Sequence, residues 1–266
     1  MNPFWSRILI GAALLPVVLY LVWLGGWWLF ALALVGGILA LHELYVIARS
    51  LRPLVLGGYA GLVLVLLGAE LGGTPWLVAG IGGTFVLSFL VFGISDARPS
   101  FTGAMGTTML GVVWVGGGLA ALVLIRDAER GRLALLTVLL AVWADDTAAY
   151  FVGRVIGRHR MAPTLSPKKS WEGFVAGTAA AIAVAFFALY QDRHTYLSIW
   201  QAIVLGATIA LAAVLGDLFE SAVKRDASVK DSGRLLGGHG GFLDRLDSLF
   251  FAAPAAYVVL LALGHA

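Results

Sequence analysis

The chain has 266 residues, of which 60% are hydrophobic and only 12% are charged, and its mean hydropathy is +0.93. This composition excludes a water-soluble globular domain and indicates a protein that crosses the membrane several times. The formal net charge is +3, and we expect no nucleic-acid partner. The chain has no cysteine, which excludes disulfides and thiolate metal sites.

Apolar runs divide the chain, and they predict an all-α polytopic membrane protein with about nine helices, each near the roughly 20 residues that a bilayer requires. The first run leads into further spans without a small-residue cleavage site, so we expect it to be a transmembrane helix. We expect one membrane-embedded domain over 1–266, with helices of unassigned role in 1–130 and a catalytic half in 131–266. The runs are Ile8–Leu24, Trp27–Ala48, Leu54–Leu71, Trp76–Ile94, Thr107–Ile125, Leu133–Val152, Phe174–Tyr190, Ile199–Leu215 and Leu249–Leu263.

The basic residues predict an orientation. An odd number of spans places the termini on opposite faces, and fourteen of the 18 Lys and Arg residues then share the face of the N-terminus. By the positive-inside tendency that face is cytoplasmic. We therefore expect a multi-pass protein of the inner (plasma) membrane, with its N-terminus and its active site facing the cytoplasm.

The first spans hold few polar residues. Arg7, His42 and Glu43 stand out there. Each is interpreted as an interfacial anchor or as a helix-packing partner whose hydrogen bonds are satisfied.

A first polar block begins where Asp145 and Asp146 lie deep in an apolar run. Ionisable groups are costly there and usually face the protein interior or a wet cavity. Asp146, Tyr150 and Gly153 follow helical spacing and share one face. Arginines come next, and the stretch 166–173, SPKKSWEG, is expected to be a basic loop that suits a polyphosphate or an anionic head group.

A second polar block, from Gly216 to Ser248, holds six carboxylates and five Lys or Arg residues. Four polar residues at the start of this block have the spacing i, i+3, i+4, i+7, which predicts that they share one face of a helix. Three polar residues at its end have the spacing i, i+3, i+4 and predict a second such face. The glycine-rich stretch 237–241 is unsuited to a helix, and its bare backbone can approach phosphates and aim N–H groups at them. The first face consists of Asp217, Glu220, Ser221 and Lys224, and the second of Asp244, Asp247 and Ser248.

Two acidic helix ends beside a glycine turn predict a site for a hard cation. Mg²⁺ prefers carboxylate and water oxygens and is often shared with substrate phosphates. A second cation remains an open alternative. The predicted metal ligands are Asp146, Asp217, Asp244 and Asp247, which together with Lys224 form the expected catalytic set. The expected substrate-binding residues are Lys168, Lys169, Ser170, Ser221, Arg225, Lys230, His239, Gly240, Gly241 and Arg245.

Three segments of the second block, 221–225, 230–233 and 239–247, resemble the signature of the phosphatidate cytidylyltransferases. The first block resembles the same family through Asp-x-x-Ala-Tyr at 146–150, Gly-Arg at 153–154 and Ser-Pro-x-Lys-Ser-Trp-Glu-Gly at 166–173. Gly237 stands where the family often has Pro, and Ala148 where Gly is common. Asp145 stands where small residues are common, so it receives no catalytic role.

The resemblance implies an enzyme that transfers the CMP moiety of CTP to phosphatidic acid, giving CDP-diacylglycerol and pyrophosphate. It also implies a helical fold, a homodimer and a lipid entrance between helices, with CTP, phosphatidic acid and membrane lipids as partners. A CTP-dependent polyprenol or phytol kinase is the alternative within similar chemistry. An ion-coupled transporter that uses Asp145 and Asp146 is less favoured, because most of the charge lies at one predicted membrane face.

Overall fold

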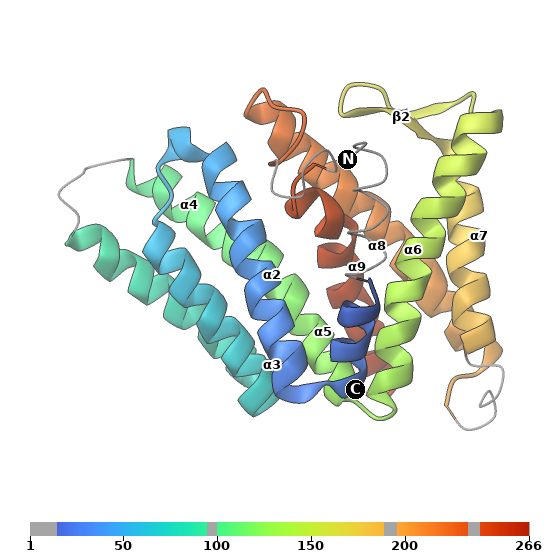
Figure 1. The fold of residues 1–266 in the computed structure, drawn as a ribbon, viewed down its shortest axis with the longest axis horizontal. Coiled ribbons are helices and arrows are strands. Elements are labelled where there is room, and N and C mark those ends of the chain that lie inside the picture. Colours follow the sequence, from blue (N-terminus) through green and yellow to red (C-terminus); the bar gives the residue numbers. More distant parts are fainter. Residues whose placement is uncertain (1–14, 95–99, 189–195, 234–239, 266) are drawn as a thin grey trace, which may run out of the picture. The chain divides into compact units, whose positions relative to one another are not determined.

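A computed structural model describes residues 15–94, 100–188, 196–233 and 240–265 of the chain (Figure 1). Across these ranges, seven helices are long and apolar enough to cross a membrane. The chain divides into two compact units, which are described separately. The N-terminal unit comprises Met1–Leu124 and Ala227–Leu246, and the C-terminal unit comprises Ile125–Asp226 and Asp247–Ala266. The polar stretch 227–246 therefore groups with the N-terminal helices.

The N-terminal unit is a group of apolar helices that begins with a short helix, Leu15–Leu24. A π-helical turn, η2, interrupts the span from Phe101 to Asp127, so that three elements form one continuous rod. The elements are α2 (Gly26–Ile47), η1 (Arg49–Leu51), α3 (Val55–Gly93), α4 (Phe101–Gly111), η2 (Val112–Gly116) and α5 (Gly117–Asp127), the last of which ends in the C-terminal unit.

Helix α3 is a helical hairpin and not one long rod. Gly73 has φ 65° and ψ −152°, which only glycine adopts readily, and the chain reverses there. Residues before the turn then contact residues after it: Gly68 lies against the backbone of Trp76, and Gly61 lies against Thr84. The missing side chains allow the two arms to approach closely, as small residues do in membrane helix pairs. The arms correspond to two of the predicted apolar runs.

The helical membrane fold predicted from composition is confirmed, and the count of nine spans is approximate. The α3 hairpin accounts for two runs that form a single element. The first apolar run is described only from Leu15 onward. The remaining runs each correspond to one helix or helical rod in the described part of the chain.

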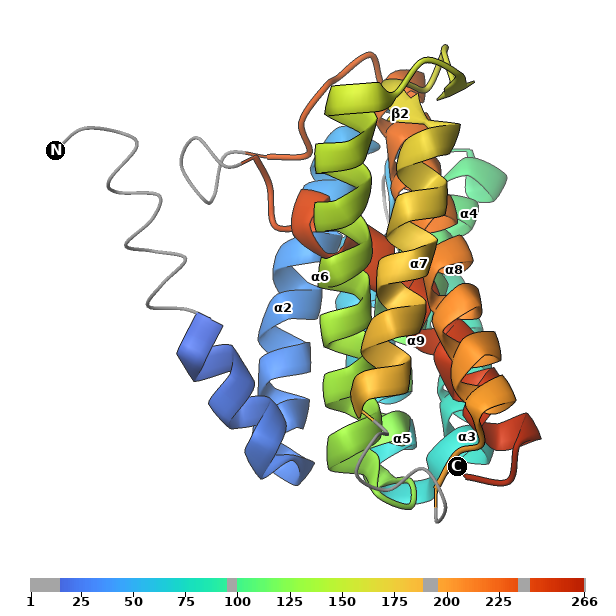
Figure 2. The ribbon, with the colours of Figure 1, turned by 90° about the vertical axis from the view of Figure 1, so that its right-hand side faces the viewer.

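The C-terminal unit contains α6 (Gly131–Ile156), α7 (Trp171–Ala188), α8 (Ile199–Asp226) and most of α9 (Leu243–Ala262). Helix α7 packs against both α6 and α8, and Figure 2 shows the three side by side. Glycines bring the helices together, because Gly173 lies against the backbone of α6 and Gly206 against the backbone of α7 at Ile182. The boundary between the units falls within α9, after Leu246.

The segment before α7 was predicted to be a basic loop, and this prediction is wrong in one respect, because the segment contains a small β-hairpin. Strand β1 (Arg160–Ala162) pairs antiparallel with β2 (Ser166–Ser170). Pro167 lies within β2, and a two-stranded sheet tolerates proline because each strand has an unpaired edge. The base of the hairpin is closed by Trp171 N–H, which donates to the His159 carbonyl at 3.0 Å.

The α3 hairpin gives the first prediction. In Gly68→Ala the new methyl group would collide with the backbone of Trp76 and Leu77, whereas at Gly82 no atom lies within 4 Å of that position. Overpacking of this kind typically costs about 1–3 kcal/mol. We expect Gly68→Ala to lower the apparent melting temperature of the detergent-solubilised protein by several degrees, and Gly82→Ala to leave it unchanged. Equal melting temperatures for the two variants would contradict the hairpin.

Candidate active site

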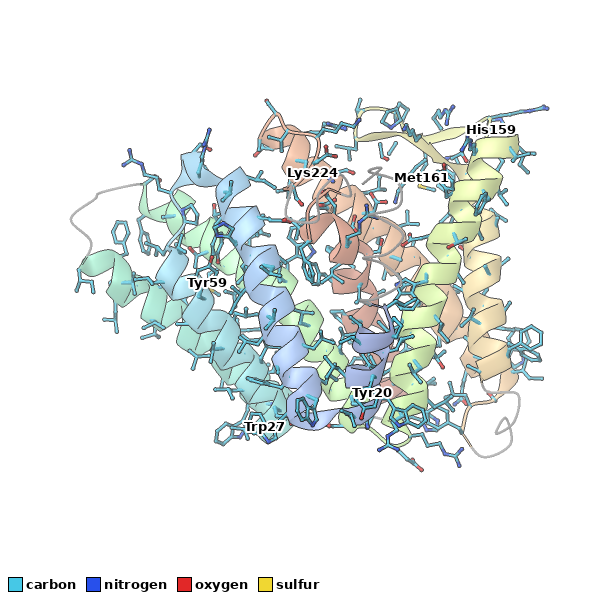
Figure 3. All side chains as sticks on the ribbon, in the orientation of Figure 1. Tyr20, Trp27, Tyr59, His159, Met161 and Lys224 are labelled. Atoms are coloured by element: carbon cyan, nitrogen blue, oxygen red, sulfur yellow. The ribbon has the colours of Figure 1, made fainter. Side chains whose placement is uncertain are left out.

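A cavity of about 680 Å³ lies within the C-terminal unit. Its volume is in the range of small-molecule sites. The walls come from the C-terminal half of α6, the β-hairpin, the first turn of α7 and the C-terminal half of α8. Figure 3 shows His159 and Met161 at the junction between the end of α6 and the hairpin, and Met161 lines the cavity. The charged and polar lining residues are Asp145, Asp146, Tyr150, Arg154, Arg160, Ser166, Lys168, Lys169, Ser170 and Asp217.

Helix α6 supplies one wall of the cavity. The predicted face of Asp146, Tyr150 and Gly153 is confirmed, since all three residues line the cavity. Arg154, one turn after Tyr150, donates from its guanidinium to the tyrosine hydroxyl at 3.0 Å. This bond holds a cationic group at the cavity wall.

Ser170 joins the hairpin to α7 in a crowded turn. Its hydroxyl accepts a hydrogen bond from Gly173 N–H at 3.2 Å, which is the contact of a helix N-cap. A Cβ at Gly153 would lie 3.0 Å from the same hydroxyl, and one at Gly157 2.6 Å from it. The glycines therefore let the hairpin approach α6 closely. Ser170 was predicted to bind substrate, and it lines the cavity, but its observed bond is structural.

Lys169 is the cation at the centre of the cavity's acidic group. Its ammonium lies 2.9 Å from Asp217 Oδ2 and 3.4 Å from the Val214 carbonyl. It also interacts electrostatically with Asp145 and Asp146. One ammonium thus faces three carboxylates. The neighbouring Lys168 is exposed, because alternate residues of a strand point to opposite faces.

Asp145, to which the sequence gave no catalytic role, lines the cavity. Its side chain is 1% exposed, and both carboxylate oxygens are buried without a hydrogen-bond partner among the described residues. Gly177 of α7 makes room for it, because a Cβ there would collide with Asp145 Oδ1. The resemblance gave this position no role. The available signal was the cost of burying a carboxylate in an apolar helix.

Asp247, in the part of α9 that belongs to this unit, extends the acidic group. It interacts electrostatically with Asp217 and Asp146, and its side chain is hydrogen-bonded with Glu220. Its Oδ1 also accepts from the Ser248 N–H at 2.8 Å. The sequence placed Asp146, Asp217 and Asp247 together, and the structure brings these three predicted residues into one electrostatic cluster.

The predicted polar face of α8 is confirmed as helical, but most of it lies outside the cavity lining. Ser221 donates to Asp217 Oδ1 at 3.4 Å. The Lys224 ammonium is 2.5 Å from Glu220 Oε2, and Glu220 is 1% exposed. Arg225 is exposed. Lys224 therefore holds a buried carboxylate in the structure, and its catalytic role stays a prediction, as do the substrate roles of Ser221 and Arg225.

The donor set of the C-terminal unit suits a hard cation such as Mg²⁺. Carboxylates gather around a single lysine, and the buried oxygens of Asp145 have no hydrogen bond among the described residues. No group of three Asp, Glu or His side chains within the described ranges already surrounds one point. Mg²⁺ does not require such a cage, because it usually takes one or two protein carboxylates and completes its shell with water and substrate phosphates. Asp146, Asp217 and Asp247 are the residues that would hold it.

The other predicted site residues belong to the N-terminal unit. Asp244, in the first turn of α9, accepts hydrogen bonds at Oδ2 from Ser232 N–H at 3.0 Å and from Gly241 N–H at 2.7 Å. The Gly241 N–H is therefore used within the protein and is not aimed at an anion as expected. Gly240 has φ 83°, which explains glycine there. Lys230 and Arg245 are exposed, and His239 lies outside the described residues.

The fold and the cavity define a polytopic helical membrane protein that gathers carboxylates and basic groups around one space. A family model described as the cytidylyltransferase family matches residues 5–263, and the chain belongs to this family. It is 35% identical to a phosphatidate cytidylyltransferase of Mycobacterium bovis, covering 94% of this chain and 85% of the relative. It is 33% identical to one of Staphylococcus epidermidis, covering 93% and 94%. The resemblance found in the sequence is thus confirmed, and neither the kinase nor the transporter alternative gains support.

The Lys169 contacts give the second prediction. Lys169→Met keeps most of the side chain but removes the cation that faces Asp217, Asp146 and Asp145. Leaving charged groups unpaired in a partly buried site costs about 1–3 kcal/mol or more. We expect the apparent melting temperature in metal-free buffer to fall by several degrees. The exposed neighbour supplies the control, since Lys168→Met should change it little. If the two variants unfold at the same temperature, Lys169 does not balance the acidic group.

Proposed function

We propose that the protein is a phosphatidate cytidylyltransferase, which joins CTP and phosphatidic acid to give CDP-diacylglycerol and pyrophosphate. The observation that carries the proposal is that Asp146 and Asp217 line the same cavity as Lys169, Arg154 and Arg160. Two polyanions that must react need both cation-binding carboxylates and basic groups for their phosphate oxygens. The relatives named as phosphatidate cytidylyltransferases support the choice of substrates.

The proposed reaction is a displacement at phosphorus. An oxygen of the phosphatidate phosphate forms a bond to the α-phosphorus of CTP, the bond to the bridging oxygen breaks, and pyrophosphate leaves with that electron pair. A phosphomonoester has its second pKa near about 6, so the attacking oxygen is largely ionised at neutral pH. No side chain is then required as a general base. The main task of the protein is to hold two anions in line against their repulsion.

Each part of the cavity has a role in this scheme. The guanidinium groups of Arg154 and Arg160 and the ammonium groups of Lys168 and Lys169 bind non-bridging phosphate oxygens. Asp146, Asp217 and Asp247 would hold the cation in the C-terminal unit. When bound, Mg²⁺ supplies positive charge that offsets the charge developing on the departing pyrophosphate. Lys169 pairs with Asp217 at 2.9 Å, and it would be free to bind phosphate oxygens if that carboxylate held a metal ion.

Further parts of the proposal come from the sequence and the family. Asp244, Lys224, Lys230 and Arg245 keep their predicted roles in catalysis and substrate binding. The enzyme is proposed to act as a homodimer in the inner membrane, with the reaction on the cytoplasmic face where CTP is present. A second cation beside Mg²⁺ remains compatible with the number of carboxylates.

The assay that tests the function is radiolabelled CTP turnover by the purified protein in mixed micelles with phosphatidic acid and Mg²⁺. We expect labelled CDP-diacylglycerol and one pyrophosphate for each product. Release of CDP instead of pyrophosphate would identify a kinase and contradict the proposal.

The third prediction concerns the carboxylates. Asp217→Asn and Asp244→Asn should each lower kcat by about 100-fold or more, since each substitution removes a carboxylate with a proposed catalytic role and with it several kcal/mol of transition-state stabilisation. Asp226→Asn is the matched control for Asp217→Asn, because Asp226 ends the same helix and is exposed. Near-normal turnover of either test variant at saturating Mg²⁺ would remove that residue from the site.

The fourth prediction concerns orientation. With nine spans and the excess of basic residues on one face, a tag before Met1 should lie in the cytoplasm and a reporter after Ala266 outside it. Protease protection in spheroplasts and in inverted vesicles measures both ends. Labelling of both termini from the same side would show that the span count is wrong by one.

A further inference from the structure

Glu43 is a buried carboxylate of α2 that contacts the polar stretch 227–246. Its side chain is 3% exposed. The Oε2 atom accepts a hydrogen bond from the Ser232 hydroxyl at 2.8 Å and a second from the Leu243 backbone N–H at 2.8 Å. Both partners lie far along the chain, and all three residues belong to the N-terminal unit. One carboxylate oxygen thus links a membrane helix to Ser232 and to the first residue of α9.

The same hydrogen bonds continue to Asp244. Ser232, bonded to Glu43 through its hydroxyl, donates its backbone N–H to Asp244 Oδ2 at 3.0 Å. Leu243, bonded to Glu43, is the first residue of α9 and immediately precedes Asp244. Gly241 N–H donates to the same aspartate oxygen at 2.7 Å. Glu43 therefore fixes two of the groups that determine where the Asp244 carboxylate points.

Two glycines of this stretch lie directly against the Glu43 carboxylate. A Cβ at Gly241 would collide with both the Ser232 hydroxyl and Glu43 Oε2, and one at Gly233 would collide with Glu43 Oε1. A second contact of α2 with the turn is made by Gly36, because a Cβ there would lie 3.2 Å from the ring of Phe242. Gly233 and Gly241 thus leave space for a carboxylate from α2, and any side chain at either position would displace it.

Packing alone does not account for a glutamate at this position. A carboxylate is costly to bury, and Glu43 Oε1 has no hydrogen-bond partner among the described residues. An apolar side chain of similar size would avoid that cost where only helix packing is needed. A negative group does suit the start of α9, because the first N–H groups of a helix have no acceptor within the helix itself and the helix dipole is positive there. Its position there favours a role in orienting this end of the helix.

We propose that Glu43 is a positioning residue for Asp244, and that the N-terminal helices take part in the reaction by this route. The proposal rests on the proposed function, in which Asp244 takes part in catalysis. Glu43 itself touches neither substrate nor metal. It holds Ser232 and the first residue of α9 so that Asp244 keeps one orientation, as outer residues do around functional carboxylates.

The fifth prediction follows. Glu43→Leu removes the acceptor and keeps an apolar side chain, so kcat per folded protein should fall about 10- to 100-fold, as is typical when an orienting partner is lost. Glu43→Gln keeps an oxygen that can accept both hydrogen bonds and should recover most of the loss. Glu70→Leu is the matched control, because Glu70 is an acidic residue of the same unit on α3. Its kcat should match that of the unchanged protein.

A double-variant cycle separates positioning from general damage. Ser232→Ala removes one of the two links, so we expect Glu43→Leu to cost much less in that background than alone, because residues that act as a unit are not additive. Losses that simply multiply, or a Glu43→Leu protein that melts earlier but keeps its kcat, would overturn the proposal. Failure of the proposed function is distinguishable, because the unchanged protein would then release no pyrophosphate from CTP.

Discussion

The cost of placing carboxylates in apolar helices is the constraint on which the arrangement of this protein depends. An ion removed from water must find an opposite charge, hydrogen bonds or a bound cation. In the C-terminal unit, Lys169 satisfies part of this requirement for Asp217, while Asp145 is buried with no hydrogen bond among the described residues. Such an imbalance has no value for packing. It is useful where a metal ion completes the charge balance, because the bound cation would relieve the repulsion among the carboxylates.

In the N-terminal unit, a buried carboxylate is stabilised by hydrogen bonds and not by a lysine. Glu43 is bonded to a hydroxyl and to backbone N–H at a helix start, and no lysine or arginine is needed for those bonds. Backbone donors are fixed by the fold, so they orient a carboxylate more strictly than a long flexible cation does. This difference fits the two proposed tasks. The carboxylates around Lys169 must exchange partners when substrates bind, whereas Glu43 must keep Ser232 and the first residue of α9 in place throughout the reaction.

Local sequence patterns predicted what depends on local physics. Apolar runs identified the membrane helices, and helical spacing identified the faces of α6 and α8 that carry Asp146 and Asp217. The β-hairpin was missed because strands as short as Arg160–Ala162 have no periodicity to detect, and because a proline such as Pro167 is uncommon within a strand. The contact of Glu43 with Ser232 was beyond reach for another reason. It joins residues 189 positions apart, and one sequence without covariation carries no information about that pairing.

The glycines show how the membrane fold and the site constrain each other. From the sequence, the glycines of the stretch 237–241 were expected to let the backbone approach phosphates. Gly177 and Gly241 instead stand directly opposite the carboxylates of Asp145 and Glu43, so the missing side chain leaves space for an oxygen atom. A methyl group at either position would force the acid out of its place, and an apolar replacement of the acid would leave a gap at the glycine. Each acid and its facing glycine are therefore expected to change together, because neither substitution alone preserves both the packing and the charge.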